Sequence, residues 1–90
     1  MSDWNLVAVL KIMPESPETN LDFIKKSFTE IAGSLAQVHT VKEVPIAFGL
    51  IAIELTLLMN DKQGGIEEIQ EKISALEGVG EVEVLDLNRL

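Results

Sequence analysis

The side chains that could carry out chemistry in this 90-residue chain are few and widely spaced. His39 is the only histidine, and the chain contains no cysteine. His39 therefore lacks a second nitrogen or thiolate ligand for a metal site, and no nucleophile stands at a triad-like spacing from it. We expect a histidine on a strand surface and a protein that is not an enzyme.

Two further patterns are weak indications of a ligand. Glu67, Glu68 and Glu71 form a row of carboxylates, but a divalent cation needs converging oxygens, and such a row on a helix is normally solvated. Gly64-Gly65 precedes a helix, but neither the P-loop pattern nor GxGxxG is present. The sequence therefore predicts no metal ion and no cofactor for this chain.

Two features are harder to explain by structure alone. Phe48 lies between a proline and a glycine in the segment PIAFG at 45–49, where a simple turn would use polar residues. Its ring either plugs one end of the core or faces a partner. The chain ends in Arg89-Leu90, a cation beside a terminal apolar residue. Fraying is the usual behaviour of a terminus, although this pair also suits insertion into a partner.

Hydrophobic periodicity predicts the elements that position these residues. Strands are expected over 4–13, 38–44, 50–59 and 81–87, from alternating or continuous apolar residues. Helices are expected over 20–36 and 66–76, from apolar residues three and four positions apart. Asn88-Arg89-Leu90 then forms a tail.

The element order βαββαβ predicts an α+β, ferredoxin-like fold, with two helices on one face of a four-stranded antiparallel sheet. The first and third strands are the most apolar, as central strands should be, and the other two carry charges and Pro45, which protect edges. Residues 1–90 suffice for a single domain of this kind. The half-apolar face without helices is either a contact surface or the ordinary exposed face of a small sheet.

Composition narrows the class of partner. Seven Lys and Arg against fifteen Asp and Glu give a net charge of −8, which argues against direct binding of nucleic acid. The longest apolar stretch, 46–59, contains Glu54 and is shorter than the ~20 residues that a bilayer span needs. No signal segment is visible, and the absence of cysteine fits a reducing compartment, so we expect a soluble, cytoplasmic protein without membrane contact.

Four segments, taken in order, resemble the archaeal elongation factor 1-beta family, the stand-alone form of the exchange domain that ends eukaryotic elongation factor 1-beta. The segments are the MPESP turn at 13–17, EVPIAFGL at 43–50, Gly64-Gly65 before the second helix, and the ending EVLDLNRL at 83–90. The resemblance covers essentially the whole chain, from Trp4 to Leu90.

The resemblance implies a guanine-nucleotide exchange factor that promotes GDP release from elongation factor 1-alpha, the GTPase that delivers aminoacyl-tRNA to the ribosome. In this family the carboxy-terminal tail is inserted near the GTPase's Mg²⁺ and phosphate site, where the penultimate basic residue disturbs Mg²⁺ coordination. That residue is Arg89 here and lysine in the eukaryotic form. The resemblance assigns contacts with the GTPase to Phe48 and its neighbours Pro45, Ile46 and Gly49, and to Leu90.

The runner-up hypothesis is a small-molecule-binding regulatory domain of the same fold. Such a domain would bind its ligand at a subunit interface, usually as a dimer, whereas the exchange factor is expected to be a monomer until it meets its GTPase. Other uses of the fold are excluded by residue type. A soft-metal carrier needs CxxC, and an RNA-recognition module needs an aromatic pair on its central strands.

Overall fold

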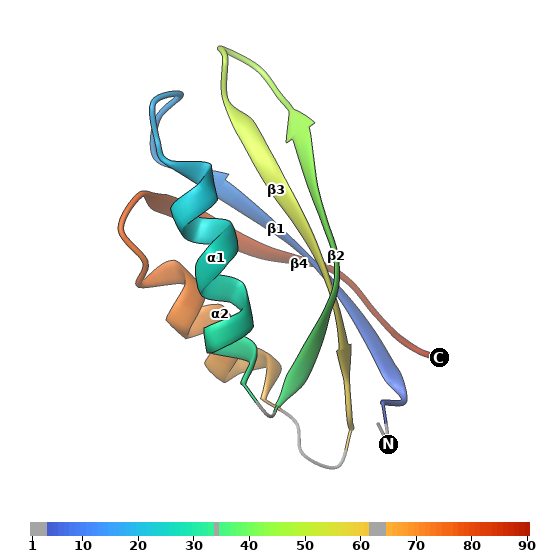
Figure 1. The fold of residues 1–90 in the computed structure, drawn as a ribbon. Coiled ribbons are helices and arrows are strands. Elements are labelled where there is room, and N and C mark those ends of the chain that lie inside the picture. Colours follow the sequence, from blue (N-terminus) through green and yellow to red (C-terminus); the bar gives the residue numbers. More distant parts are fainter. Residues whose placement is uncertain (1–3, 34, 62–64) are drawn as a thin grey trace.

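The sheet and two helices of this chain follow the order that the sequence predicts. The computed structural model describes residues 4–33, 35–61 and 65–90. Its elements are β1 (Leu6–Pro14), α1 (Leu21–Ala32), β2 (Ala36–Pro45), β3 (Ile51–Met59), α2 (Ile66–Ser74) and β4 (Val79–Arg89). The strands form one antiparallel sheet in the order β2-β3-β1-β4, and both helices lie on one face of it (Figure 1). The predicted α+β, ferredoxin-like fold is confirmed.

The hydrophobic core lies between the helices and the inner face of the sheet. The two central strands contribute every second residue, because alternate side chains of a strand point to opposite faces. Full burial of one large apolar side chain stabilises the fold by about 1.5–3 kcal/mol. The largest fully buried side chains are Leu10, Ile12, Ile24, Phe28, Ile53, Leu55, Leu57, Met59, Ile69 and Ile73.

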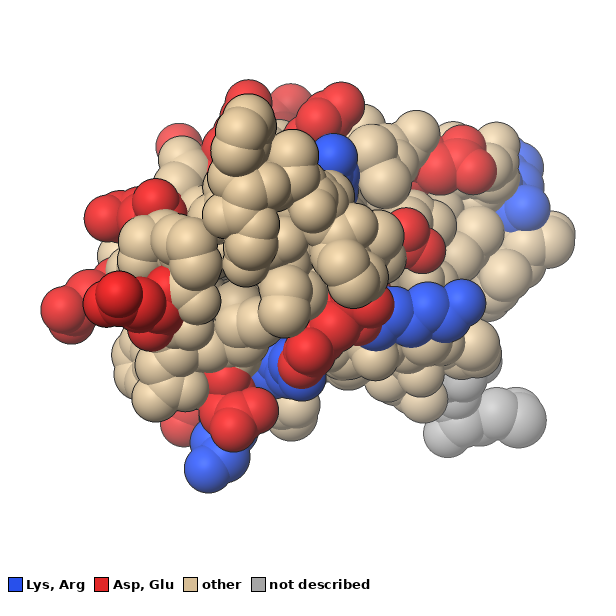
Figure 2. Space-filling view, turned by 90° about the horizontal axis from the view of Figure 1, so that it is seen from above, with Lys and Arg blue, Asp and Glu red and all other residues tan. Residues whose placement is uncertain are grey.

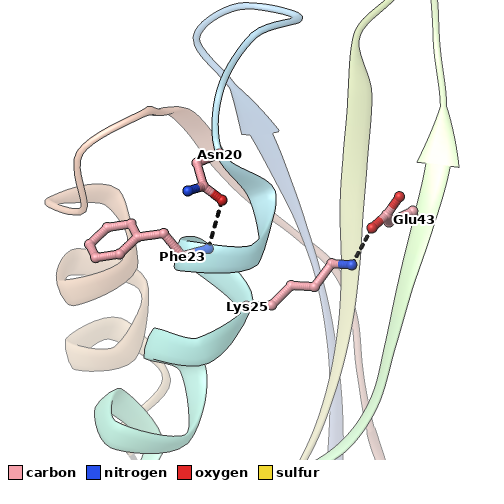
Figure 3. Close-up of polar contacts among 4 residues, drawn as sticks. All are labelled: Asn20, Phe23, Lys25 and Glu43. Atoms are coloured by element: carbon pink, nitrogen blue, oxygen red, sulfur yellow. Dashed lines mark hydrogen bonds and ion pairs between the residues drawn. The ribbon is translucent and has the colours of Figure 1, made fainter.

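Polar contacts fix the start of α1 and its position over the sheet. The side-chain oxygen of Asn20, the N-cap, accepts a hydrogen bond of 3.1 Å from the backbone N–H of Phe23 (Figure 3). Such a cap is worth about 1 kcal/mol. Lys25 forms an ion pair with Glu43 of β2, so the helix is also tied to an edge strand (Figure 3).

The first helix ends earlier than the sequence predicts. The expected helix runs to Ala36, but α1 ends at Ala32, and Gly33 follows with a φ of 52°. The Gly33 N–H donates to the Thr29 carbonyl at 3.1 Å, and the Leu35 N–H donates to the Ala32 carbonyl at 2.9 Å. A glycine with positive φ turns the chain out of the helix, so Ala36 already belongs to β2.

An irregularity in β2 changes which side chains reach the core. The pairing with β3 shifts between Val38 and Thr40, so His39 is an extra residue on this strand and is exposed. Val38 and Val41 consequently both pack against the core, although strict alternation would place them on opposite faces. Pro45 ends this edge strand, where a missing N–H donor is tolerated.

The last strand reaches almost to the end of the chain, which corrects the predicted tail. The expected strand covers 81–87, but β4 runs from Val79 to Arg89. Asn88 pairs with Val7 and Arg89 pairs with Leu6. The polar residues at 88 and 89 suggest coil, but hydrogen bonding to a central strand uses only the backbone, so the side chains do not prevent it.

Substitution in β1 tests the two faces of the sheet. Leu10 is 0% exposed, so Leu10→Ala should lower the free energy of unfolding by about 2–5 kcal/mol, through lost burial and the cavity left behind. Val9 is half-buried on the helix-free face, so Val9→Ala should cost about 1 kcal/mol. Urea unfolding of both variants measures the difference, and equal losses would contradict this arrangement.

Candidate functional site

The β2–β3 hairpin closes through a tight turn. The Ile46 N–H donates to the Leu50 carbonyl at 2.9 Å, and the Leu50 N–H donates to the Ala47 carbonyl at 3.1 Å. The two central residues, Phe48 and Gly49, have φ values of 60° and 75°. Positive φ at both positions is the requirement of a type I′ turn, which normally uses Asn-Gly, Asp-Gly or Gly-Gly.

Phe48 breaks this residue preference. Among the described residues it is the non-glycine residue with positive φ, and the residue is 93% exposed. Holding such a residue in this backbone conformation costs on the order of 1–3 kcal/mol, and an exposed ring recovers none of it by burial. Phe48 therefore does not plug the core. It presents a bare aromatic ring at the tip of the hairpin.

The segment around Phe48 is itself uncharged, but charged residues lie close to it. Pro45 is exposed, and Ile46 lines a hollow of about 180 Å³ on the helix-free face, together with apolar residues such as Val44 and with the charged residues Lys11 and Glu54. A Cβ on Gly49 would lie 3.8 Å from the Pro17 Cβ, so the hairpin tip lies beside the β1–α1 turn. Figure 2 looks down on this end, where uncharged surface lies between acidic side chains.

Arg89 lies at the other end of the sheet and is not frayed. Its Nη2 atom is 2.9 Å from Asp61 Oδ2, just after β3, while its own side chain remains 72% exposed. Asn5, just before β1, donates from Nδ2 to Asp61 Oδ1 at 2.9 Å, and its Oδ1 accepts the Asp61 N–H at 2.9 Å. Three chain segments thus meet around one guanidinium.

Leu90 completes this second group. Its N–H donates to the Asn5 carbonyl at 2.9 Å, so the backbone is held up to the last residue, while the residue as a whole is 69% exposed. Sequence reasoning missed Asn5 and Asp61, because their contact joins residues 56 positions apart and neither lies in a recognisable motif.

The predicted site residues therefore form two groups rather than one. Pro45, Ile46, Phe48 and Gly49 come together beyond the Pro14 end of β1, whereas Arg89 and Leu90 lie at the Leu6 end (Figure 1). The molecule measures 40 × 20 × 19 Å along its principal axes. A small ligand cannot contact both groups at once, but a macromolecular partner can.

Other candidate residues lie apart from both groups. His39 Nδ1 lies 2.7 Å from Thr40 Oγ1 on the exposed side of β2. Glu68 pairs with Lys72 one turn along α2 at 3.7 Å. Within residues 4–33, 35–61 and 65–90, His, Asp and Glu form no group of three that could hold a metal ion. In the same ranges, no helix is long and apolar enough to cross a membrane.

The glycine pair before α2 is described only in part. Gly64 lies outside the described residues, and Gly65 is the N-cap of α2 with a φ of 99° and no side-chain cap. Its carbonyl accepts the first helical hydrogen bond, from the Ile69 N–H at 3.0 Å. Gly65 thus serves as the entry to the helix, as the turn-like sequence indicates.

Two solved structures of other proteins have the same arrangement of helices and strands. The ACT domain from GTP pyrophosphokinase of Chlorobium tepidum has a TM-score of 0.61 at 18% identity, covering 90% of this chain and 99% of that one. The C-terminal domain of the MgtC protein from Mycobacterium tuberculosis has a TM-score of 0.68 at 13% identity, covering 100% and 93%. Identities this low show the fold alone, so the ACT likeness does not favour a regulatory domain.

Relatives in sequence are far more informative. Elongation factor 1-beta of Methanothermobacter thermautotrophicus is 41% identical over 86 residues, which cover 96% of this chain and 97% of that protein. Elongation factor 1-beta of Pyrococcus abyssi is 36% identical over 91 residues, which cover both chains fully. The family model of the EF-1 guanine nucleotide exchange domain matches residues 7–90. The chain therefore belongs to the EF-1 guanine nucleotide exchange domain family, together with these archaeal elongation factors 1-beta.

Proposed function

We propose that this chain promotes GDP release from elongation factor 1-alpha during translation elongation. The observation that carries the proposal is the family match over residues 7–90, which includes both exposed groups. The proposal describes a cytoplasmic chain that is a monomer until it binds the GTPase. It acts by non-covalent contacts, without a cofactor or metal ion of its own.

Arg89 is proposed to act on the nucleotide site of the GTPase. A bound Mg²⁺ ion neutralises the phosphates of a nucleotide, so loss of its coordination weakens the hold on GDP. A guanidinium brought close to that site repels the metal and offers N–H donors to phosphate oxygens. The exposed position of Arg89 at the end of β4 supports this role, because little of the side chain is covered.

Phe48 is proposed to be the second contact with the GTPase. Aromatic side chains dominate binding energy at protein interfaces when they enter a pocket on the partner. Phe48 is 93% exposed on a hairpin without charged residues from Pro45 to Leu50, so burial of its ring desolvates no ionised group of this loop. Contacts at both ends of a rigid sheet would fix the orientation in which Arg89 meets the nucleotide site.

Arg89→Ala tests the role of the terminal cation. Loss of a charge-assisted contact should lower the maximal rate constant of GDP release by at least about tenfold, while the fold remains intact. The measurement is release of fluorescent GDP from an archaeal elongation factor 1-alpha. Lys72→Ala, which removes a cation from α2, is the matched control and should behave as wild type. An unchanged rate for Arg89→Ala would refute the tail mechanism.

Phe48→Asn separates binding from folding. Asn-Gly is the preferred pair for a type I′ turn, so the variant should raise the free energy of unfolding by about 1 kcal/mol. Loss of the aromatic contact should raise the concentration needed for half-maximal exchange by about 30-fold or more. Thermal unfolding and exchange titrations provide the two readouts.

Phe23→Ala is the control for this experiment, because Phe23 is 48% exposed in the first turn of α1 and lines a hollow with Glu77 and Gly78 rather than with residues of the hairpin. It should leave the exchange titration unchanged. A more stable Phe48→Asn variant that retains wild-type exchange would remove Phe48 from the proposed interface.

A further inference from the structure

The ion pair between Arg89 and Asp61 has a function of its own if Arg89 acts on the GTPase. We propose that Asp61 is a positioning residue that holds the Arg89 guanidinium ready for the nucleotide site. The inference rests on the proposed function, because it requires Arg89 to be the acting group.

The contact restricts the one part of Arg89 that the sheet leaves free. The backbone is held on both sides, since Arg89 pairs with Leu6 and the Leu90 N–H donates to the Asn5 carbonyl. The long side chain would otherwise sample many rotamers, and ordering it in the step that releases GDP would slow that step. The contact of 2.9 Å between Nη2 and Asp61 Oδ2 limits this freedom before the partner arrives.

Asp61 is itself anchored, so the restriction is transmitted from the sheet. Asn5 donates its side-chain amide to Asp61 Oδ1 and accepts the Asp61 N–H, both at 2.9 Å. The two oxygens of one carboxylate thus have different partners, Asn5 on one and Arg89 on the other. Only 29% of the Asp61 side chain is exposed, compared with 72% of the Arg89 side chain.

The same geometry argues against a restraint that keeps Arg89 away from the partner. The pair uses Nη2, and most of the side chain faces solvent. An exposed ion pair changes an equilibrium by at most about fivefold, so a phosphate, which accepts a forked contact, can replace the carboxylate readily. A contact of this strength can orient the guanidinium without preventing its transfer.

Asp61→Asn tests the proposal, because it keeps the shape of the side chain and an oxygen for Asn5 while removing the charge. The variant should lower the maximal rate constant of GDP release about two- to fivefold, with an unchanged half-saturating concentration. In the Arg89→Ala background the same substitution should have no further effect, since Asp61 acts through Arg89. Glu68→Gln, which removes the same charge from an exposed ion pair of α2, should match wild type.

Each alternative result overturns the proposal. Faster release with Asp61→Asn would identify a restraint instead. If Asp61→Asn lowered the rate constant equally in the wild-type and Arg89→Ala backgrounds, the role of Asp61 would be purely structural. If the wild-type protein promotes exchange and Asp61→Asn leaves its rate constant unchanged, Asp61 has no part in the mechanism.

A spectroscopic readout separates this proposal from the proposed function. Arg89 is the only arginine in the sequence, so its Nε–Hε group gives a single side-chain signal in ¹⁵N NMR. The heteronuclear NOE of that signal should fall in Asp61→Asn and stay constant in Glu68→Gln. If the wild-type protein does not accelerate GDP release from the GTPase, but the NOE falls in Asp61→Asn, the proposed function is wrong and the ordering of Arg89 by Asp61 is confirmed. If exchange occurs and the NOE does not change, the positioning role is wrong.

Discussion

The pairing of β1 with β3 on one side and β4 on the other is the constraint on which the rest of the molecule depends. Leu6 lies opposite both Met59 and Arg89, and Ile12 lies opposite both Ile53 and Val82. A nine-residue strand spans roughly 30 Å, so this pairing sets how far apart the two ends of the sheet lie. The Phe48 turn lies beyond one end and the Arg89 group at the other, and their separation is therefore a property of the sheet.

Only the Phe48 group departs from what local stability favours, and it does so without disturbing the core. Phe48 has a positive φ that suits glycine or asparagine, and the residue gains little from burial. Arg89 ends an edge strand with its side chain largely in solvent, which is ordinary for an arginine, and its ion pair with Asp61 holds it there. The central strands and helices supply the buried apolar surface that offsets a strained turn.

The fold of this chain and the placement of these two groups are separate properties of the molecule. The sheet with two helices is shared with an ACT domain and with a domain of MgtC, at 18% and 13% identity. Those likenesses concern the arrangement of the elements, whereas the two groups proposed to contact the GTPase consist of a few exposed side chains at the ends of the sheet. An aromatic ring and a cation on opposite ends of a 40 Å molecule suit a large protein surface better than a small ligand.

Periodicity and residue preference act over short stretches, so the order and type of the elements, the central places of β1 and β3, and the unusual placement of Phe48 and Arg89 could all be predicted without coordinates. Other features depend on contacts between distant parts of the chain. The extra residue at His39, the early end of α1 and the full length of β4 depend on pairing and packing between segments distant in the chain. The sequence left open whether the Phe48 ring is buried or exposed, and the backbone conformation of the closed hairpin shows that it is exposed. The Asn5–Asp61–Arg89 contacts exist because antiparallel pairing brings the start of β1 and the ends of β3 and β4 together at one end of the sheet, and no local sequence pattern encodes those contacts.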